Sequence, residues 1–91
     1  MEFEWDDAKS ATNRRQRGFG FAYAAAIFLG ATLDEIDERH DYGETRIRAI
    51  GAVGNEVLVV IYTDRGDTRR IISARRANRK ERLKWQSFVS R

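Results

Sequence analysis

The chain has 91 residues, a length that allows one domain with a single modest core but not a second domain, so we expect one domain over residues 1–91. It contains no cysteine and one histidine, which argues against a disulfide framework or a zinc site, and we predict neither a metal nor another cofactor. The net charge of +3 is unevenly distributed: residues 65–91 carry ten Lys or Arg against two acids, whereas residues 1–64 carry seven against twelve. Such segregation is typical of nucleic-acid binding, or of a basic half that pairs with the acidic half of its own chain.

No segment of the sequence predicts contact with a membrane. The longest weakly polar run, residues 19–31, is far too short to span a bilayer. The acidic start of the chain is also unlike the basic start of a signal peptide. We therefore expect a cytoplasmic protein with no membrane partner.

The N-terminal third predicts a strand followed by two helices. Aromatic and acidic residues alternate over residues 2–6, which is the pattern of a short half-buried strand. Asp6 is placed to cap a helix that is expected to begin at Asp7 and to end at Gly18. A second helix is expected from Phe21 to Leu29, with Gly30 as its C-cap, and its alanines allow close approach to a sheet.

Strands dominate the rest of the chain, and one more helix follows them. The expected strands cover residues 32–37, 45–53, 56–63 and 68–74. Gly54-Asn55 and Gly66-Asp67 are two-residue hairpin signals, because Gly, Asn and Asp tolerate positive φ. Asn78 followed by Glu81 is a capping pair that opens a C-terminal helix. The predicted fold class is α+β, with two N-terminal helices and a C-terminal helix around a mainly antiparallel twisted sheet.

Two-residue turns would fix the cross-strand partners of both hairpins. In that register Arg46 faces Thr63, and Thr63 faces Arg70. Arg48 lies beside them, so three arginines cluster at one end of one sheet face. Further along that face the register puts Ile50, Val59, Ile61, Ile72 and Ala74. The opposite face is expected to hold Ile47, Val60, Tyr62, Ile71 and Arg75, and a slip of one residue would exchange the two faces.

Five blocks of the sequence together form a specific pattern. They are Phe3-Glu-Trp-Asp-x-x-Lys9-x-x-x-Asn13, Asp37-x-Arg39-His40-Asp41-Tyr42-Gly43-Glu44-x-Arg46, Ile50-Gly51, Tyr62-Thr63-Asp64-Arg65 and Arg70-Ile-Ile-Ser-Ala-Arg75-x-Ala77-x-x-x-Glu81. In this order and spacing they resemble the BrnT family of toxins nearly end to end. The resemblance implies a type II toxin with a RelE-like fold and a ribonuclease activity that arrests translation. It also implies a BrnA-like ribbon-helix-helix antitoxin, through whose complex the toxin would contact operator DNA.

The residues themselves suggest how RNA would be cleaved without a metal. Internal attack requires removal of the 2′-OH proton, stabilisation of charge on the phosphate, and protonation of the leaving oxygen. Arginine suits only the second task, because it stays cationic and its planar fork matches two phosphate oxygens. The candidates for this task are Arg46, Arg65, Arg70 and Arg75, with Lys9, Asn13 and Arg17 as outer RNA contacts. His40 and Glu44, with Asp64 as a further possibility, are the candidates for acid–base catalysis. Tyr62 is a candidate to stack on a base.

Each candidate also has a structural interpretation. Tyr62 alternates with core residues and suits packing, and Glu44 suits an ion pair with Arg46 or Arg65. His40 suits a solvent-exposed loop, Lys9 and Asn13 suit the solvated face of a helix, and Arg75 suits a brace for the C-terminal helix. The cations of that helix suit either solvent or an acidic antitoxin.

The chain departs from the family pattern at the end of its first expected helix. Where the family typically has Lys-His-Gly, this chain has Gln16-Arg17-Gly18. If the Lys-His pair contributes to RNA binding or proton transfer, the change weakens cleavage. The alternative function is then a toxin-fold protein that acts as antitoxin partner and corepressor on operator DNA. A basic nucleic-acid-binding module with no toxin role is a third possibility.

Overall fold

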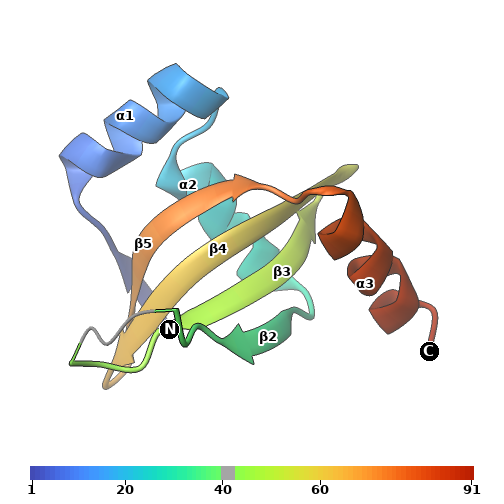
Figure 1. Ribbon diagram of the computed structural model, residues 1–91. Coiled ribbons are helices and arrows are strands. Elements are labelled where there is room, and N and C mark those ends of the chain that lie inside the picture. Colours follow the sequence, from blue (N-terminus) through green and yellow to red (C-terminus); the bar gives the residue numbers. More distant parts are fainter. Residues whose placement is uncertain (40–42) are drawn as a thin grey trace.

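The computed structural model describes residues 1–39 and 43–91, which form three α-helices, one 3-10 helix and five strands (Figure 1). In chain order they are β1 (Glu2–Glu4), α1 (Asp7–Arg17), α2 (Phe21–Ala24), the 3-10 helix η1 (Ala25–Leu29), β2 (Leu33–Ile36), β3 (Ile47–Val53), β4 (Glu56–Arg65), β5 (Thr68–Arg76) and α3 (Arg79–Val89). The predicted α+β class is confirmed. The second predicted helix begins where expected but tightens to 3-10 geometry after its first turn.

The five strands form one mixed sheet in the order β1-β5-β4-β3-β2. Strand β1 pairs in parallel with β5, and the other three pairings are antiparallel. The two predicted hairpins join β3 to β4 and β4 to β5, with Gly54 at φ 58° and Gly66 at φ 61° in the turns. The sheet therefore combines a hairpin meander, as predicted, with a parallel edge strand from the N-terminus.

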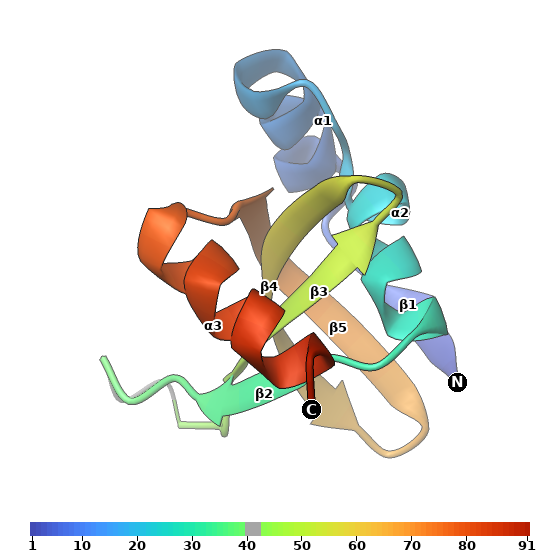
Figure 2. The same ribbon diagram turned by 90° about the vertical axis from the view of Figure 1, so that its right-hand side faces the viewer.

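Helices lie on both faces of the sheet. Helix α2 and η1 cover one face and α3 lies on the other, as the two perpendicular views show (Figures 1 and 2). The main core lies under α2 and η1, with Phe21, Ile27, Leu58 and Ile71 at its centre, each at most 2 % exposed. A smaller cluster under α3 joins Ile50, Val59 and Ala77 to the half-buried Trp85. Central strand β4 is buried on both faces, which explains its continuous apolar run.

Strand β3 and η1 approach each other closely at Gly51. A Cβ added there would lie 2.8 Å from Ile27 Cβ, so the contact requires glycine. Ala24 of α2 is fully buried in the same core, as expected for alanines at a close helix–sheet contact. None of the helices in the described residues is long and apolar enough to cross a membrane.

A β-bulge in β5 corrects the predicted register of the second hairpin. Arg65↔Thr68 through Tyr62↔Ile71 pair as a two-residue turn requires, but the next pair is Ile61↔Ser73. The extra residue, Ile72, shifts everything beyond it by one position and so exchanges the faces. The prediction for Ala74 and Arg75 was therefore wrong: Ala74 joins the main core, and Arg75 turns toward the α3 face.

Candidate functional site

Five arginines lie on the face of the sheet that carries α3, and we call them the arginine face: Arg46, Arg48, Arg65, Arg70 and Arg75. Alternation along the strands puts Arg48 of β3, Arg65 of β4 and Arg70 of β5 on this side. Arg75 joins them only because of the bulge, since its partner Val59 packs in the cluster under α3. The register predicted from the sequence grouped Arg46, Arg48 and Arg70, and the structure adds Arg65 and Arg75 to this group.

Two glutamates link the arginines at the hairpin end of this face. The carboxylate of Glu44 lies 3.7 Å from Arg46 Nε and 3.3 Å from Arg65 Nη2. The carboxylate of Glu4 lies 3.9 Å from Arg65 and 3.7 Å from Arg70, because the parallel pairing sets Glu4 beside Arg70. Positive and negative groups thus alternate from Arg46 to Arg70.

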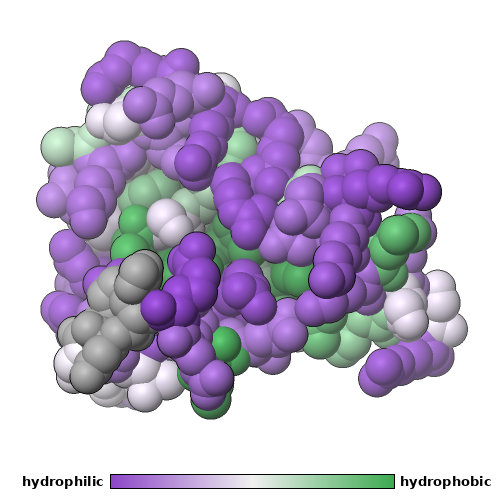
Figure 3. Space-filling model, viewed as in Figure 1, coloured by the Kyte–Doolittle hydropathy of each residue, from purple (hydrophilic) through white to green (hydrophobic). Residues whose placement is uncertain are grey.

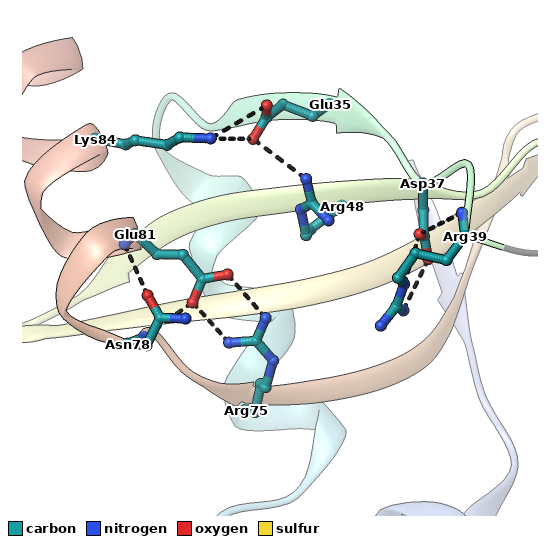
Figure 4. Close-up of polar contacts among 8 residues, drawn as sticks. All are labelled: Glu35, Asp37, Arg39, Arg48, Arg75, Asn78, Glu81 and Lys84. Carbon is teal, nitrogen blue, oxygen red and sulfur yellow. Dashed lines mark hydrogen bonds and ion pairs between the residues drawn. The ribbon is translucent and has the colours of Figure 1, made fainter.

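At the other end of the arginine face, Arg75 is bound by Glu81 of α3 (Figure 4). Its Nη1 and Nη2 donate to the two carboxylate oxygens of Glu81 at 2.7 and 2.8 Å. Glu81 also accepts from the backbone N–H of Asn78, whose side chain accepts from the Glu81 N–H, both at 2.9 Å. One carboxylate therefore closes the helix cap and orients a guanidinium. These hydrogen bonds lower the pKa of Glu81 and raise the pKa of Arg75.

The arginines differ in how firmly carboxylates hold them. Arg48 lies 3.6 Å from Glu35, which also contacts Lys84 of α3 at 3.5 Å (Figure 4). Ion pairs of this length on a partly exposed surface contribute little, so a phosphate can replace the carboxylate at small cost. The bidentate Arg75–Glu81 pair is stronger and fixes the direction of the fork. Arg75 is thus the pre-oriented member of the arginine face.

Asp37 and Arg39 extend the charged surface, although the sequence assigned them no role. The Asp37 side chain is 1 % exposed and accepts from Arg39 at 2.8 and 3.0 Å. These bonds keep the pKa of Asp37 below its ordinary value. The Arg39 charge opposes the effect of Glu81 on the pKa of Arg75. The Asp37-x-Arg39 spacing was the signal available in the sequence.

The acid–base candidates lie in different surroundings. Glu44 sits between Arg46 and Arg65, inside the arginine face. Asp64 accepts two hydrogen bonds from Arg69, at 2.8 and 3.0 Å, on the other side of the sheet. His40 lies outside the described residues. Among residues 1–39 and 43–91, no group of three or more His, Cys, Asp or Glu is arranged to hold a metal ion.

The three α1 candidates have different environments. Lys9 is exposed and has no ion-pair partner within the described part of the chain. Asn13 is 7 % exposed, and its Nδ2 donates to the Phe19 carbonyl at 2.9 Å. Arg17 Nη1 donates to the Ala74 carbonyl of β5 at 2.7 Å. Lys9 is therefore open to a ligand, whereas Asn13 and Arg17 fasten α1 to the body of the protein.

Tyr62 lies on the opposite face from the arginines, within the main core. It is 3 % exposed, and its hydroxyl donates to Asp34 Oδ2 at 2.8 Å. The Arg69 guanidinium stacks 3.9 Å above its ring. Burial and the Asp34 carboxylate raise the pKa of Tyr62 well above its ordinary value. These contacts favour packing over base stacking.

The Asn13 geometry gives a testable expectation. Asn13→Ala should lower the free energy of unfolding by about 1–3 kcal/mol, because it leaves the buried Phe19 carbonyl without this donor. Urea unfolding of this variant beside Lys9→Ala, which removes no side-chain hydrogen bond or ion pair of the described residues, measures the difference. Equal stability of the two variants would contradict a structural role for Asn13.

The lowered pKa values of Asp37 and Glu81 predict an acid limit to stability. A carboxylate whose pKa is depressed by folding contributes stability above its unfolded pKa, near 3.8 for Asp and 4.5 for Glu, and that contribution is lost as pH falls through the folded pKa. The melting temperature should therefore be flat near neutrality and fall below about pH 4.5. The Asp37→Asn, Glu81→Gln double variant should show a shallower fall, and identical pH profiles would contradict the assignment.

The fold and the arginine face define a small α+β protein with a surface suited to phosphate groups. Over residues 5–81 the chain matches the model of a family described as the ribonuclease toxin BrnT of type II toxin-antitoxin systems. The chain therefore belongs to the BrnT family of ribonuclease toxins, as its sequence blocks implied. No curated protein matches it. The matched range contains the whole arginine face together with Glu81, and the family implies an antitoxin partner.

Proposed function

We propose that this protein is an endoribonuclease toxin that cleaves RNA on its arginine face without a metal, with residues 1–91 acting as one RelE-like toxin domain. The observation that carries the proposal is the collection of five arginines on one sheet face in a member of a ribonuclease toxin family. Guanidinium groups stabilise the charge that grows on phosphate oxygens during cleavage.

Within this proposal, Arg75 is the principal phosphate ligand. Arginine has five N–H donors; two bind Glu81, and a third is shared with the Arg76 carbonyl at 3.4 Å, so two remain for a phosphate. Arg46, Arg65 and Arg70, at the hairpin end of the face, bind adjacent phosphates of the same RNA strand, and these phosphates displace Glu44 and Glu4. The Glu44 and His40 side chains carry the two proton transfers, from the 2′-OH and to the leaving 5′-oxygen.

Helix α3 is the proposed surface for a BrnA-like ribbon-helix-helix antitoxin. Arg79 and Lys80 have no ion-pair partner within the described residues, and Leu83 and Val89 are each 54 % exposed. Unpaired cations beside exposed apolar side chains complement an acidic amphipathic segment. Operator DNA is then bound through the antitoxin, and both partners meet the toxin in the cytoplasm.

Expression of the toxin alone in bacteria tests the proposal. Wild type should arrest growth and create new RNA 5′ ends, and Arg65→Ala should relieve both, because losing one phosphate-stabilising donor costs on the order of 2 to 4 kcal/mol in the transition state. Arg91→Ala removes the same charge at an exposed C-terminal position and should still arrest growth. Normal growth with folded wild-type protein would overturn the proposal.

One observation favours a second function, that of a corepressor with weakened cleavage. At the departure from the family pattern, the Arg17 guanidinium is bound to the Ala74 carbonyl and is not free to transfer a proton. The Gln16→Lys, Arg17→His double variant restores the family residues. A gain in cleavage from a low level would support the corepressor function, whereas strong cleavage by wild type would exclude it.

A further inference from the structure

A groove of about 390 Å³ lies between α1 and β5. The side chains of Lys9, Thr12 and Gln16 line one wall, and Ile72 and Ser73 of the bulge line the other. The arginine face continues directly from this groove, because Ser73 and Arg75 lie two positions apart on the same side of β5, roughly 6.6 Å along the strand. The space-filling view shows apolar surface between the hydrophilic side chains of α1 and those of the sheet (Figure 3).

The groove is open because β5 lacks a strand neighbour there. Strand β1 pairs only with Thr68 to Arg70, and within the described residues no strand pairs with that edge of β5 beyond this point. Helix α1 runs along the free edge, fastened to it by the bond from Arg17 to the Ala74 carbonyl. Ile72 is also displaced from the β4 ladder by the bulge. Main-chain groups at the free edge can therefore bind a ligand.

Side chains in the groove offer hydrogen bonds that the protein itself does not use. Within the described part of the chain, neither Gln16 nor Ser73 makes a side-chain hydrogen bond, and Lys9 has no ion pair. A glutamine amide presents a donor and an acceptor in one plane, and a serine hydroxyl presents both. Half-buried Ile72 supplies an apolar surface on which a flat ring can lie.

We propose that this groove is a base-recognition subsite that holds a single-stranded RNA nucleotide next to the phosphate bound at Arg75, and this inference rests on the proposed function. An RNA strand on the arginine face reaches Ser73 directly from Arg75. A nucleobase matches the mixture of amide, hydroxyl and apolar groups, and Lys9 at the wall meets the next phosphate. Gln16 thereby becomes a specificity-determining residue at the position where the chain departs from the family pattern.

The subsite is tested by cleaving a pool of RNA molecules of random sequence, in which each of the four bases occurs on either side of the bonds that can be cut. Purified wild type should prefer one base at one flanking position, and Gln16→Ala with Ser73→Ala should reduce that preference roughly 5- to 100-fold while other sites are still cut. Gln86→Ala, an exposed glutamine on α3, is the matched control and should keep the wild-type pattern.

The outcomes separate this inference from the proposed function. If wild type cuts RNA and the groove variant keeps its site preference, the subsite is overturned while the ribonuclease stands. If the variant keeps that preference but binds the antitoxin more weakly, the groove is a protein contact instead, which also overturns it. If wild type does not cut, the proposed function fails. Short oligonucleotides are then titrated by NMR, where selective shifts at Gln16 and Ser73 support the subsite and their absence overturns it.

Discussion

Replacing Arg75 by alanine is expected to reduce RNA cleavage by a factor on the order of 10² to 10³, the loss typical of removing one pre-oriented donor to a developing oxyanion. The effect should be the largest on the arginine face, because the bidentate carboxylate of Glu81 fixes the direction of the Arg75 fork before RNA binds. Single-turnover cleavage of a short RNA measures it. Arg75→Lys should recover part of the loss, since lysine keeps the charge but not the planar fork.

This result requires a control for folding, because Arg75→Ala leaves Glu81 as an unpaired carboxylate only 13 % exposed. The Arg75→Ala, Glu81→Gln double variant removes both charges and should melt closer to wild type while remaining as inactive as Arg75→Ala. Glu81→Gln alone keeps the arginine but offers its fork one acceptor oxygen in place of two, so its activity should lie between those of wild type and Arg75→Ala. A folded double variant that cleaves at the wild-type rate would contradict the role of Arg75.

Leu58→Ala is expected to cause the largest loss of stability, about 2–5 kcal/mol. Leu58 is fully buried at the centre of the main core, so its truncation leaves a cavity on the face away from the arginines. Such a loss is a large part of the 5–15 kcal/mol typical of a domain. Urea unfolding measures it, and any loss of toxicity should follow the loss of folded protein.

A matched substitution on the surface sharpens that measurement. Leu83 of α3 is 54 % exposed, so Leu83→Ala removes the same atoms without opening a cavity and should change stability by less than about 1 kcal/mol. Equal losses of stability in Leu58→Ala and Leu83→Ala would mean that Leu58 does not lie in a tightly packed core. Leu83→Ala should also remain toxic, because its side chain is exposed and is not part of the arginine face.

The local signals in the sequence predicted much of the fold. Both hairpins, the Asp6 cap of α1 and the Asn78–Glu81 capping box appear where turn and cap chemistry put them, because each depends on residues only a few positions apart. The bulge at Ile72 was not predictable, since neither a glycine nor a proline marks it within Thr68–Arg76. Its effect was non-local, as it turned Arg75 toward α3 and Ala74 into the core.

Less of the candidate site was predictable. The sequence identified four of the five arginines as phosphate ligands and offered Glu44 as a partner of Arg46 or Arg65, which the ion pairs confirm. It did not identify Glu4, because Glu4 reaches Arg70 only through the parallel pairing of β1 with β5. Glu81 was recognised as a cap, and its second bond to Arg75 depends on the bulge. The groove beside α1 was not predicted, because it is formed where one edge of β5 has no neighbouring strand. No local sequence pattern indicates such an open edge.

The most direct test of the account is cleavage by the purified toxin in the presence of a chelator. Wild type should cut RNA with EDTA present and leave 2′,3′-cyclic phosphate ends, the product of attack by the 2′-oxygen, while the Arg75→Ala, Glu81→Gln variant should leave the RNA intact. Cleavage that requires added Mg²⁺, or equal cleavage by wild type and the variant, would contradict the claim that the arginine face performs the reaction without a metal.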